Sequence, residues 1–137
     1  MDIGTAVIIE FKRPMTDDRN PIRQVFGYVR DLRNGTATTK DGRTLKVKEG
    51  TPFYTYILCD LTPKMREYAE DAGLKVTPDD QGFVGFNATH QVYVEVFSYD
   101  KAISDAGKRN AILFHKLGLP PEFKKPPAPG ADANATP

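Results

Sequence analysis

An apolar run that delivers an acid and a lysine two positions apart constrains this chain more than any other feature. Residues 7–14 read Val-Ile-Ile-Glu-Phe-Lys-Arg-Pro, and the three consecutive β-branched residues favour a buried strand that Pro14 ends. Side chains alternate along a strand, so Glu10 and Lys12 leave one face and Phe11 leaves the other. Charges beside a buried run cost free energy unless they pair, bind a metal or open onto a cleft. This pair is therefore the first candidate for a functional site.

Length and composition limit the class of protein. A chain of 137 residues with 39% hydrophobic residues builds one core, so we expect a single domain over residues 1–119 and a disordered Pro/Ala-rich tail over residues 120–137. The formal net charge is +1, so binding to nucleic acid needs a local basic patch. The single cysteine, Cys59, excludes an internal disulfide framework and reads as a buried, inert thiol. No apolar stretch approaches about 18 residues and no signal-peptide pattern is present, which predicts a soluble cytoplasmic protein without a membrane partner.

Three helices are expected from capping residues and helical spacing. Asn20 and Pro21 open the first, whose apolar positions recur every three or four residues up to an Asn34-Gly35 stop. Thr62-Pro63 opens the second, and Gly73 closes it. The third spans about residues 100–117, with an interruption near position 107 as an alternative.

Strand signals lie between these helices. Residues 53–59 are aromatic and β-branched, which is typical of a central strand. Residues 83–86 and 91–98 predict an antiparallel pair, and residues 36–50 predict a short exposed hairpin or loop around Asp41-Gly42. The order of elements predicts an α/β domain with a mixed central sheet flanked by helices.

The strand carrying Glu10-x-Lys12, followed by a helix with Gln24 and Tyr28 four residues apart, resembles the PD-(D/E)xK nuclease superfamily, most nearly its RecB type. The resemblance implies a restriction-endonuclease-like fold and hydrolysis of nucleic-acid phosphodiesters with Mg²⁺ or Mn²⁺. It assigns Glu10 as the metal ligand and Lys12 as the catalytic lysine. It assigns Gln24 and Tyr28 to supporting the site or contacting the substrate.

These residue types suit that chemistry. Carboxylates are the hard ligands that Mg²⁺ prefers, and the metal activates water and neutralises charge on a phosphate under attack. A lysine beside the metal adds a fixed positive charge and a hydrogen-bond donor. Residues four apart share one face of a helix, so Gln24 and Tyr28 can serve the same site.

The sequence departs from the family upstream of Glu10. The family places a helix and a hairpin there, and the hairpin supplies a metal-binding aspartate. Only nine residues precede Glu10, and Asp2 is the only acid among them. We therefore expect that the N-terminal elements of the fold are missing, and that the chain is a piece of a larger protein or its site is incomplete. A sheet that begins at an inner strand exposes an edge, so a homodimer is also expected.

A second resemblance covers the chain up to about residue 120. Its opening at residues 7–14 and its close at residues 112–120, Ile-Leu-Phe-His-Lys-Leu-Gly-Leu-Pro, resemble the C-terminal region of large bacterial proteins with an N-terminal ATPase of the histidine-kinase and Hsp90 class. This resemblance implies the ATPase region of a longer protein as a partner, and a DNA-directed or defence-related role.

The other ionisable residues each allow a functional and a structural interpretation. Asp60, Glu95 and Asp100 follow or lie within expected strands, where they either complete a metal site or are solvated strand-end acids. His90 and His115 are isolated, which favours structural or surface roles. The basic residues of the first strand and helix are either a phosphate-contacting patch or a solvated face. They are Arg13, Arg19, Arg23, Arg30 and Arg33, joined by Lys40, Arg43, Lys46 and Lys48 of the loop beyond. Arg13, Arg23 and Arg30 are the candidate nucleic-acid contacts.

The leading hypothesis from the sequence is a metal-dependent nuclease-type domain. The alternative is a catalytically inactive nuclease-like module that binds DNA or a partner within a larger ATPase. An enzyme built on Cys59 or a histidine has no supporting constellation of residues.

Overall fold

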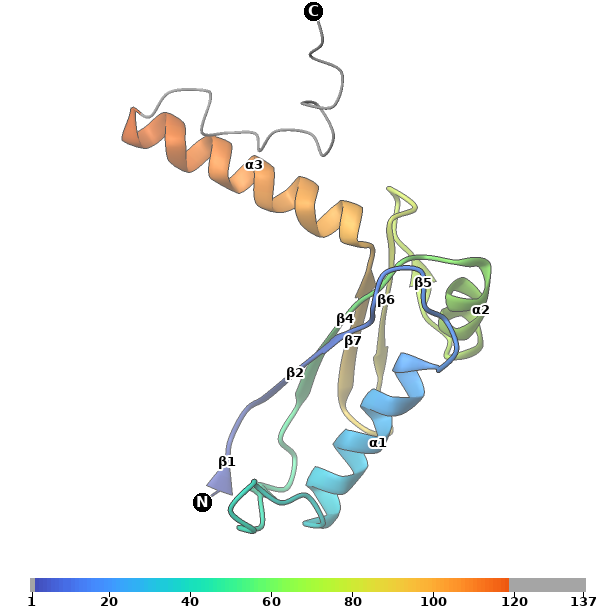
Figure 1. Ribbon diagram of the computed structural model, residues 1–137. Helices are drawn as coiled ribbons and strands as arrows, with labels where there is room; N and C mark the ends of the chain where they lie inside the picture. Colours follow the sequence, from blue (N-terminus) through green and yellow to red (C-terminus); the bar gives the residue numbers. More distant parts are fainter. Residues whose placement is uncertain (1, 119–137) are drawn as a thin grey trace, which may run out of the picture. The chain divides into compact units, whose positions relative to one another are not determined.

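The computed structural model is described for residues 2–118, and the predicted tail at 120–137 lies outside the described residues. Five strands form a mixed sheet in the order β2-β4-β7-β6-β5 (Figure 1), and β1 and β3 pair in a separate two-stranded parallel sheet. The predicted α/β architecture with a mixed central sheet is confirmed. The strands are β1 (Asp2–Ile3), β2 (Ala6–Phe11), β3 (Lys46–Val47), β4 (Phe53–Leu58), β5 (Lys75–Val76), β6 (Gly82–Asn87) and β7 (Val92–Phe97); the helices are α1 (Pro21–Asn34), α2 (Pro63–Asp71) and α3 (Tyr99–Leu117).

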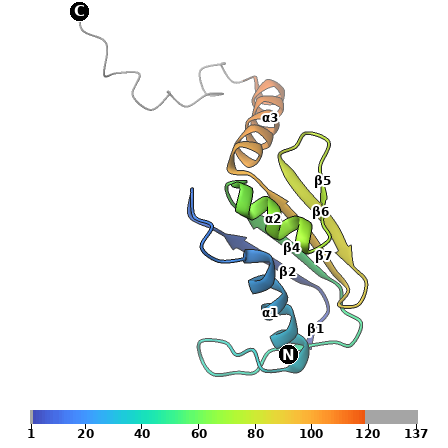
Figure 2. The ribbon, with the colours of Figure 1, turned by 90° about the vertical axis from the view of Figure 1, so that its right-hand side faces the viewer.

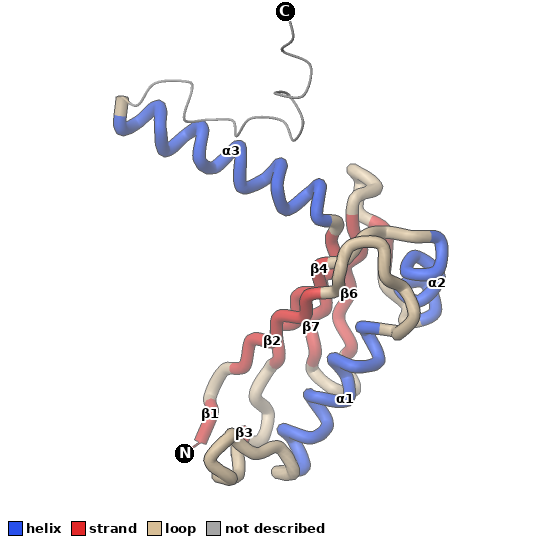
Figure 3. The backbone as a smooth tube through the Cα atoms, viewed as in Figure 1, coloured by secondary structure: helices blue, strands red, loops and turns tan. Residues whose placement is uncertain are grey.

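Three parallel strands determine where the helices go. β2, β4 and β7, which are red in Figure 3, pair in parallel. β6 pairs antiparallel with β7, and β5 pairs antiparallel with β6. The chain adds β4 and then β7 in the same direction across the sheet, and right-handed crossovers of that kind place their helices on one face. Figures 1 and 2 show α1 and α2 on the same side of the sheet.

The core lies between this face and the two helices. β4 and β7 alternate, so that Phe53, Ile57 and Val94 are buried beneath the helices while their neighbours along each strand are not. The predicted central position of β4 is confirmed, since it pairs with β2 on one side and β7 on the other. The helices contribute the other buried apolar side chains of the core: Ile22, Val25, Val29, Met65 and Ala69.

The helix starts follow the predicted capping residues. The Asn20 side chain accepts hydrogen bonds from the backbone N–H groups of Ile22 and Arg23 at 3.0 and 3.1 Å. Thr62 accepts one from Met65 N–H at 3.2 Å. Gly35 ends α1 with φ of 68°, the left-handed conformation that glycine adopts without steric penalty.

Three expectations need correction or completion. α3 is continuous from Tyr99 to Leu117, so the interruption considered near Gly107 is wrong; one helical glycine costs only about 1 kcal/mol. The predicted hairpin at 36–50 is a turn with one antiparallel bridge, Thr38 to Thr44. The two-residue strands β1, β3 and β5 are too short to give a periodic signal.

Residues up to Lys101 form one compact unit, and a second unit begins at Ala102. Most of α3 belongs to the second unit, and none of its described residues is buried. Ile103, Leu113 and Leu117 share one side of α3 by helical spacing, and each is at least half exposed. None of the helices in residues 2–118 is long and apolar enough to cross a bilayer.

Two glycines in β6 test how tightly the sheet is packed. A Cβ at Gly82 would lie 2.5 Å from the carbonyl oxygen of Val96, whereas one at Gly85 would meet the flexible end of Leu74 at 2.6 Å. We expect Gly82→Ala to lower the free energy of unfolding by about 1–3 kcal/mol, because backbone must move. Gly85→Ala should lower it less, because Leu74 can rotate away. Urea unfolding followed by circular dichroism measures both, and a larger loss in Gly85→Ala would contradict the packing described.

Candidate functional site

The carboxyl ends of β2, β4 and β7 meet at one edge of the sheet. Phe11 is in register with Leu58, which is in register with Phe97, so the residues that follow these strands are neighbours. Lys12 N–H donates to Leu58 O at 2.9 Å and Cys59 N–H donates to Phe97 O at 3.3 Å, which extends the ladder past the strand ends. Ligands of open α/β sheets bind at this edge. We call Glu10, Lys12, Cys59, Asp60 and Tyr99 the strand-end cluster.

Glu10 and Lys12 lie as the sequence predicts. Glu10 shares the helix-covered face of β2 with Ala6, and Lys12 continues this alternation one residue past the strand end. Both residues are half-buried. Within residues 2–118 neither takes part in an ion pair, since the ion pairs there join other residues. Lys12 opens onto a cleft of about 400 Å³, lined by Phe11, Lys12, Arg13, Thr16, Asp18 and Arg19. A half-buried lysine without a carboxylate partner is available to an anion.

Gln24 and Tyr28 differ in what they face. The Oε1 atom of Gln24 is buried and accepts no hydrogen bond within the described residues. Tyr28, one turn further along α1, is 45% exposed. Gln24 therefore lies against the protein with an unsatisfied acceptor, and Tyr28 lies in solvent.

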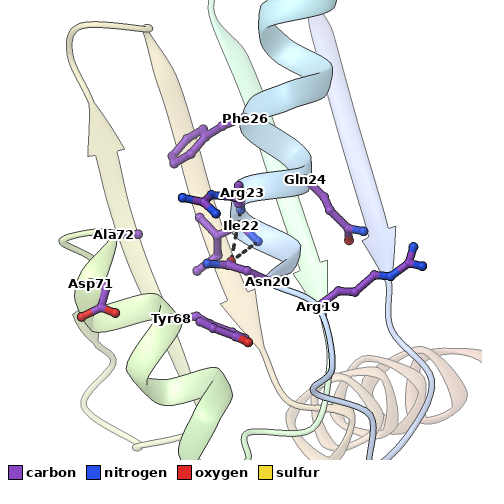
Figure 4. Close-up of a pocket in the computed structure, with 9 residues that line it drawn as sticks. All are labelled: Arg19, Asn20, Ile22, Arg23, Gln24, Phe26, Tyr68, Asp71 and Ala72. Carbon is purple, nitrogen blue, oxygen red and sulfur yellow. Dashed lines mark hydrogen bonds between the residues drawn. The ribbon is translucent and has the colours of Figure 1, made fainter.

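A larger cleft of about 740 Å³ lies around the start of α1 (Figure 4). Figure 4 shows Gln24 and Arg19 pointing to one side of α1 and Arg23 to the other, with Tyr68 contributed by α2. Arg19 lines both clefts, so one cation joins them. Arginines bind phosphate, and aromatic rings stack on bases. The lining residues are Arg19, Asn20, Ile22, Arg23, Gln24, Phe26, Tyr68, Asp71 and Ala72.

Asp60 has a role that the sequence did not indicate. Its Oδ2 accepts a hydrogen bond from the Met15 N–H at 2.6 Å. Met15 has φ of 58°, an unusual conformation for a residue with a side chain. The carboxylate thus holds the loop that follows β2, and with it the wall of the smaller cleft. Asp60 is half-buried and hydrogen-bonded, so it is not simply a solvated strand-end acid.

Tyr99 also supports the cluster and was not identified from the sequence. Its hydroxyl donates a hydrogen bond to the carbonyl oxygen of Lys12. Burial raises the pKa of Tyr99, and nearby Cys59 and Asp60 raise it further, so the hydroxyl keeps its proton and remains a donor. The bond ties the start of α3 to the end of β2. An aromatic residue two positions after a strand that ends at this edge was the available signal.

Cys59 is buried, as predicted, and its surroundings disfavour the reactive thiolate. Burial raises the pKa of the thiol to about 11; Asp60 adds to the rise and Lys12 opposes it. Both charged residues are therefore close enough to Cys59 to influence it.

The donor set for a metal is incomplete in the part of the chain that the structure describes. It contains no group of three or more His, Cys, Asp and Glu side chains that could hold a metal ion. Glu10 supplies one hard oxygen ligand, which fits part of a Mg²⁺ site. Glu95 leaves the opposite face of the sheet from Glu10, and His90 is exposed in the β6–β7 turn, so neither extends the set.

The predicted basic residues separate into two groups. Arg13 lines the smaller cleft, Arg23 lines the larger one, and Arg30 is exposed on α1. Arg33 instead donates to Thr51 O at 3.1 Å and to the carbonyl of His90, and its guanidinium lies 4.6 Å from the Phe53 ring centre. Arg33 is therefore a structural residue that joins α1 to the sheet, and it does not belong to a phosphate-contacting patch.

No protein-family model, curated protein or solved structure matches this chain.

Cys59 gives a direct test of the strand-end cluster. With a pKa of about 11, about 0.1% of the thiol is ionised at pH 8, so alkylation of the folded chain should be far slower than in urea. The stability contributed by the neutral thiol is complete below pH 9.0 and is lost as the pH rises toward about 11. Mass spectrometry of the alkylated chain measures the rate. Equal rates in folded and unfolded protein would contradict the burial of Cys59.

Proposed function

We propose that this domain is a metal-dependent nuclease-type domain of the PD-(D/E)xK kind, which acts on nucleic-acid phosphodiesters with Mg²⁺ or Mn²⁺. One observation supports this function best. Two opposite charges, Glu10 and Lys12, lie half-buried and without ion-pair partners on the helix-covered face, at the carboxyl end of a parallel strand. Charges in such a position are costly to the fold and mark functional sites.

The surrounding strand-helix-strand unit also suits the proposal. β2 leads through α1 into β4, which pairs with β2 in parallel, and α1 carries Gln24 with its buried, unsatisfied Oε1. The restriction-endonuclease-like fold is part of the proposal, with β2 as its Glu-x-Lys strand. Elements upstream of β2 would complete such a fold along the free edge of that strand.

Each residue of the site has a distinct role under this proposal. Glu10 would hold the metal through its carboxylate oxygens, and the metal when bound activates water and neutralises charge on the phosphate. Lys12 would place its ammonium group against a phosphate oxygen in the smaller cleft. Gln24 lines the larger cleft and would use its amide acceptor to orient a donor there. Tyr28 is exposed, so it would contact substrate from solvent.

The proposed roles of Glu10 in metal binding and of Lys12 in cleavage can be distinguished by experiment. We expect Glu10→Gln to abolish Mn²⁺ binding measured by titration calorimetry, because the amide lacks the charge that attracts the ion. Lys12→Ala should keep Mn²⁺ binding and lose cleavage of a labelled oligonucleotide by at least a hundredfold. Lys108→Ala, at an exposed lysine of α3, is the matched control and should cleave like the wild type. Unchanged cleavage by folded Lys12→Ala protein would rule out the mechanism.

The second candidate is a nuclease-like module that binds DNA, or a partner chain within a larger ATPase, without cleaving. The incomplete donor set in the described residues favours it. The two clefts would then serve binding alone, with Arg19 shared between them. Absence of both Mn²⁺ binding and cleavage in the wild type, with retained affinity for nucleic acid, would favour this module over the enzyme.

Arg23 tests the nucleic-acid contact that both candidates share. Arg23 lines the larger cleft and is an exposed residue. We expect Arg23→Ala to weaken binding of a single-stranded oligonucleotide and to reduce the slope of log K against log salt by about 1, as for one lost phosphate contact. Fluorescence anisotropy at several salt concentrations measures the slope. Arg109→Ala, on the exposed surface of α3, is the control; an equal loss there would mean that binding is not localised at α1.

A further inference from the structure

The face of the sheet opposite α1 and α2 is apolar and uncovered by any element of residues 2–101. The strand register and the alternation of side chains determine which residues lie on this face, namely those that point away from the helices. Three of them, Ile9, Phe11 and Phe86, are 53%, 65% and 62% exposed. Its members are Val7, Ile9 and Phe11 of β2, Tyr54, Tyr56 and Leu58 of β4, Tyr93, Glu95 and Phe97 of β7, and Val84 and Phe86 of β6. We call these residues the open face.

The open face is organised rather than scattered. Tyr93 packs against Tyr54 and Tyr56, with ring centres 6.3 and 6.4 Å apart. The Tyr93 hydroxyl donates to Glu95 at 3.2 Å, so the one acid of the face is partnered within it. Tyrosines give large, rigid contact area with a polar tip and are enriched at protein interfaces. The face therefore has the composition of an interface.

Its size indicates what can cover it. The four strands β2, β4, β7 and β6 have six residues each, which gives a surface of about 19 by 20 Å, or about 400 Å² in projection. The largest apolar patch on a typical monomer is about 300–600 Å², and a patch of that size often has a function. One helix is about 10–12 Å wide, so it would cover only half of this width. The opposite face of the sheet is covered by two helices, α1 and α2. A second sheet, packed about 10 Å away, covers all of it.

We propose that the open face binds the open face of a second copy of this chain, forming a two-fold symmetric dimer of face-to-face sheets. A two-fold axis lets one surface meet itself, so a single self-complementary face is sufficient. The face carries one acid and, at its β5 edge, Lys75, so it lacks the positive charge that a nucleic acid would need. The dimer would leave Glu10 and Lys12 accessible, because both leave the other face of the sheet; Phe11 lies on the open face and also lines the smaller cleft.

The test is the oligomeric state of the full chain over a range of concentrations. Sedimentation equilibrium should give twice the chain mass of 15.2 kDa for the wild type. Ile9→Thr combined with Phe11→Thr keeps residues suited to a strand and should weaken the dimer at least tenfold. Val76→Thr is the matched control, because Val76 is 51% exposed but pairs with Phe83 on the other face; it should dimerise like the wild type. A monomeric wild type, or a dimer unaffected by the double variant, would overturn the proposal.

A conservative variant guards against failure to fold. Glu95→Gln keeps an acceptor for Tyr93 and removes a charge that the dimer would bury, so it should tighten the dimer about tenfold. An unchanged or weaker dimer in Glu95→Gln would exclude this face from the interface.

Tyrosine fluorescence distinguishes a second copy of the chain from another part of the same chain as the partner that covers the open face. The chain has no tryptophan and six tyrosines, three of which, Tyr54, Tyr56 and Tyr93, lie on the open face. Acrylamide should quench emission less as the concentration rises and the dimer forms. A monomer with tyrosines shielded at every concentration would mean that another part of the chain covers the face, and would overturn the proposal; so would tyrosines that stay equally accessible throughout.

Discussion

The parallel pairing of β2 with β4 and of β4 with β7 is the constraint on which the rest of the structure depends. Parallel strands need crossover connections, and because both crossovers step the same way across the sheet, α1 and α2 lie on one face (Figure 2). The same pairing brings the carboxyl ends of the three strands to one edge. The core, the strand-end cluster and the open face are all consequences of this arrangement.

The strand-end cluster is held by contacts between parts of the chain that are distant in sequence. Asp60 accepts the Met15 N–H and fixes the loop after β2, while Tyr99 donates to the Lys12 carbonyl from the residue that begins α3. Hydrogen bonds to a carboxylate are stronger than those between neutral groups, so Asp60 restrains the backbone beside Lys12. Asp60 and Tyr99 thus hold the backbone of Lys12 at the cleft that its side chain lines.

Local sequence patterns predicted the helices and strands, but they could not predict contacts between residues far apart in the sequence. Asn20, Pro21 and Gly35 mark α1 because capping is a short-range interaction, and the alternation of Val92, Val94 and Val96 marks β7. The Asp60–Met15 and Tyr99–Lys12 contacts join residues 45 and 87 positions apart, and no local pattern specifies them. The sequence also could not show that the more apolar side of β2 faces away from the helices, because both sides of that strand carry apolar residues.

That direction opposes the local hydrophobic preference of β2. A shift of its register by one residue would turn Val7, Ile9 and Phe11 toward the helices and Glu10 and Lys12 outward, and would bury more apolar area. The structure keeps the other register, with Ala6 opposite Phe53 and the Lys12 N–H on Leu58 O. One strand therefore departs from ordinary burial on both of its faces, with charge turned inward and apolar surface turned outward. Such departures are expected where a surface is used, and β2 has two: a charged pair at the strand-end cluster and an apolar side that completes the open face.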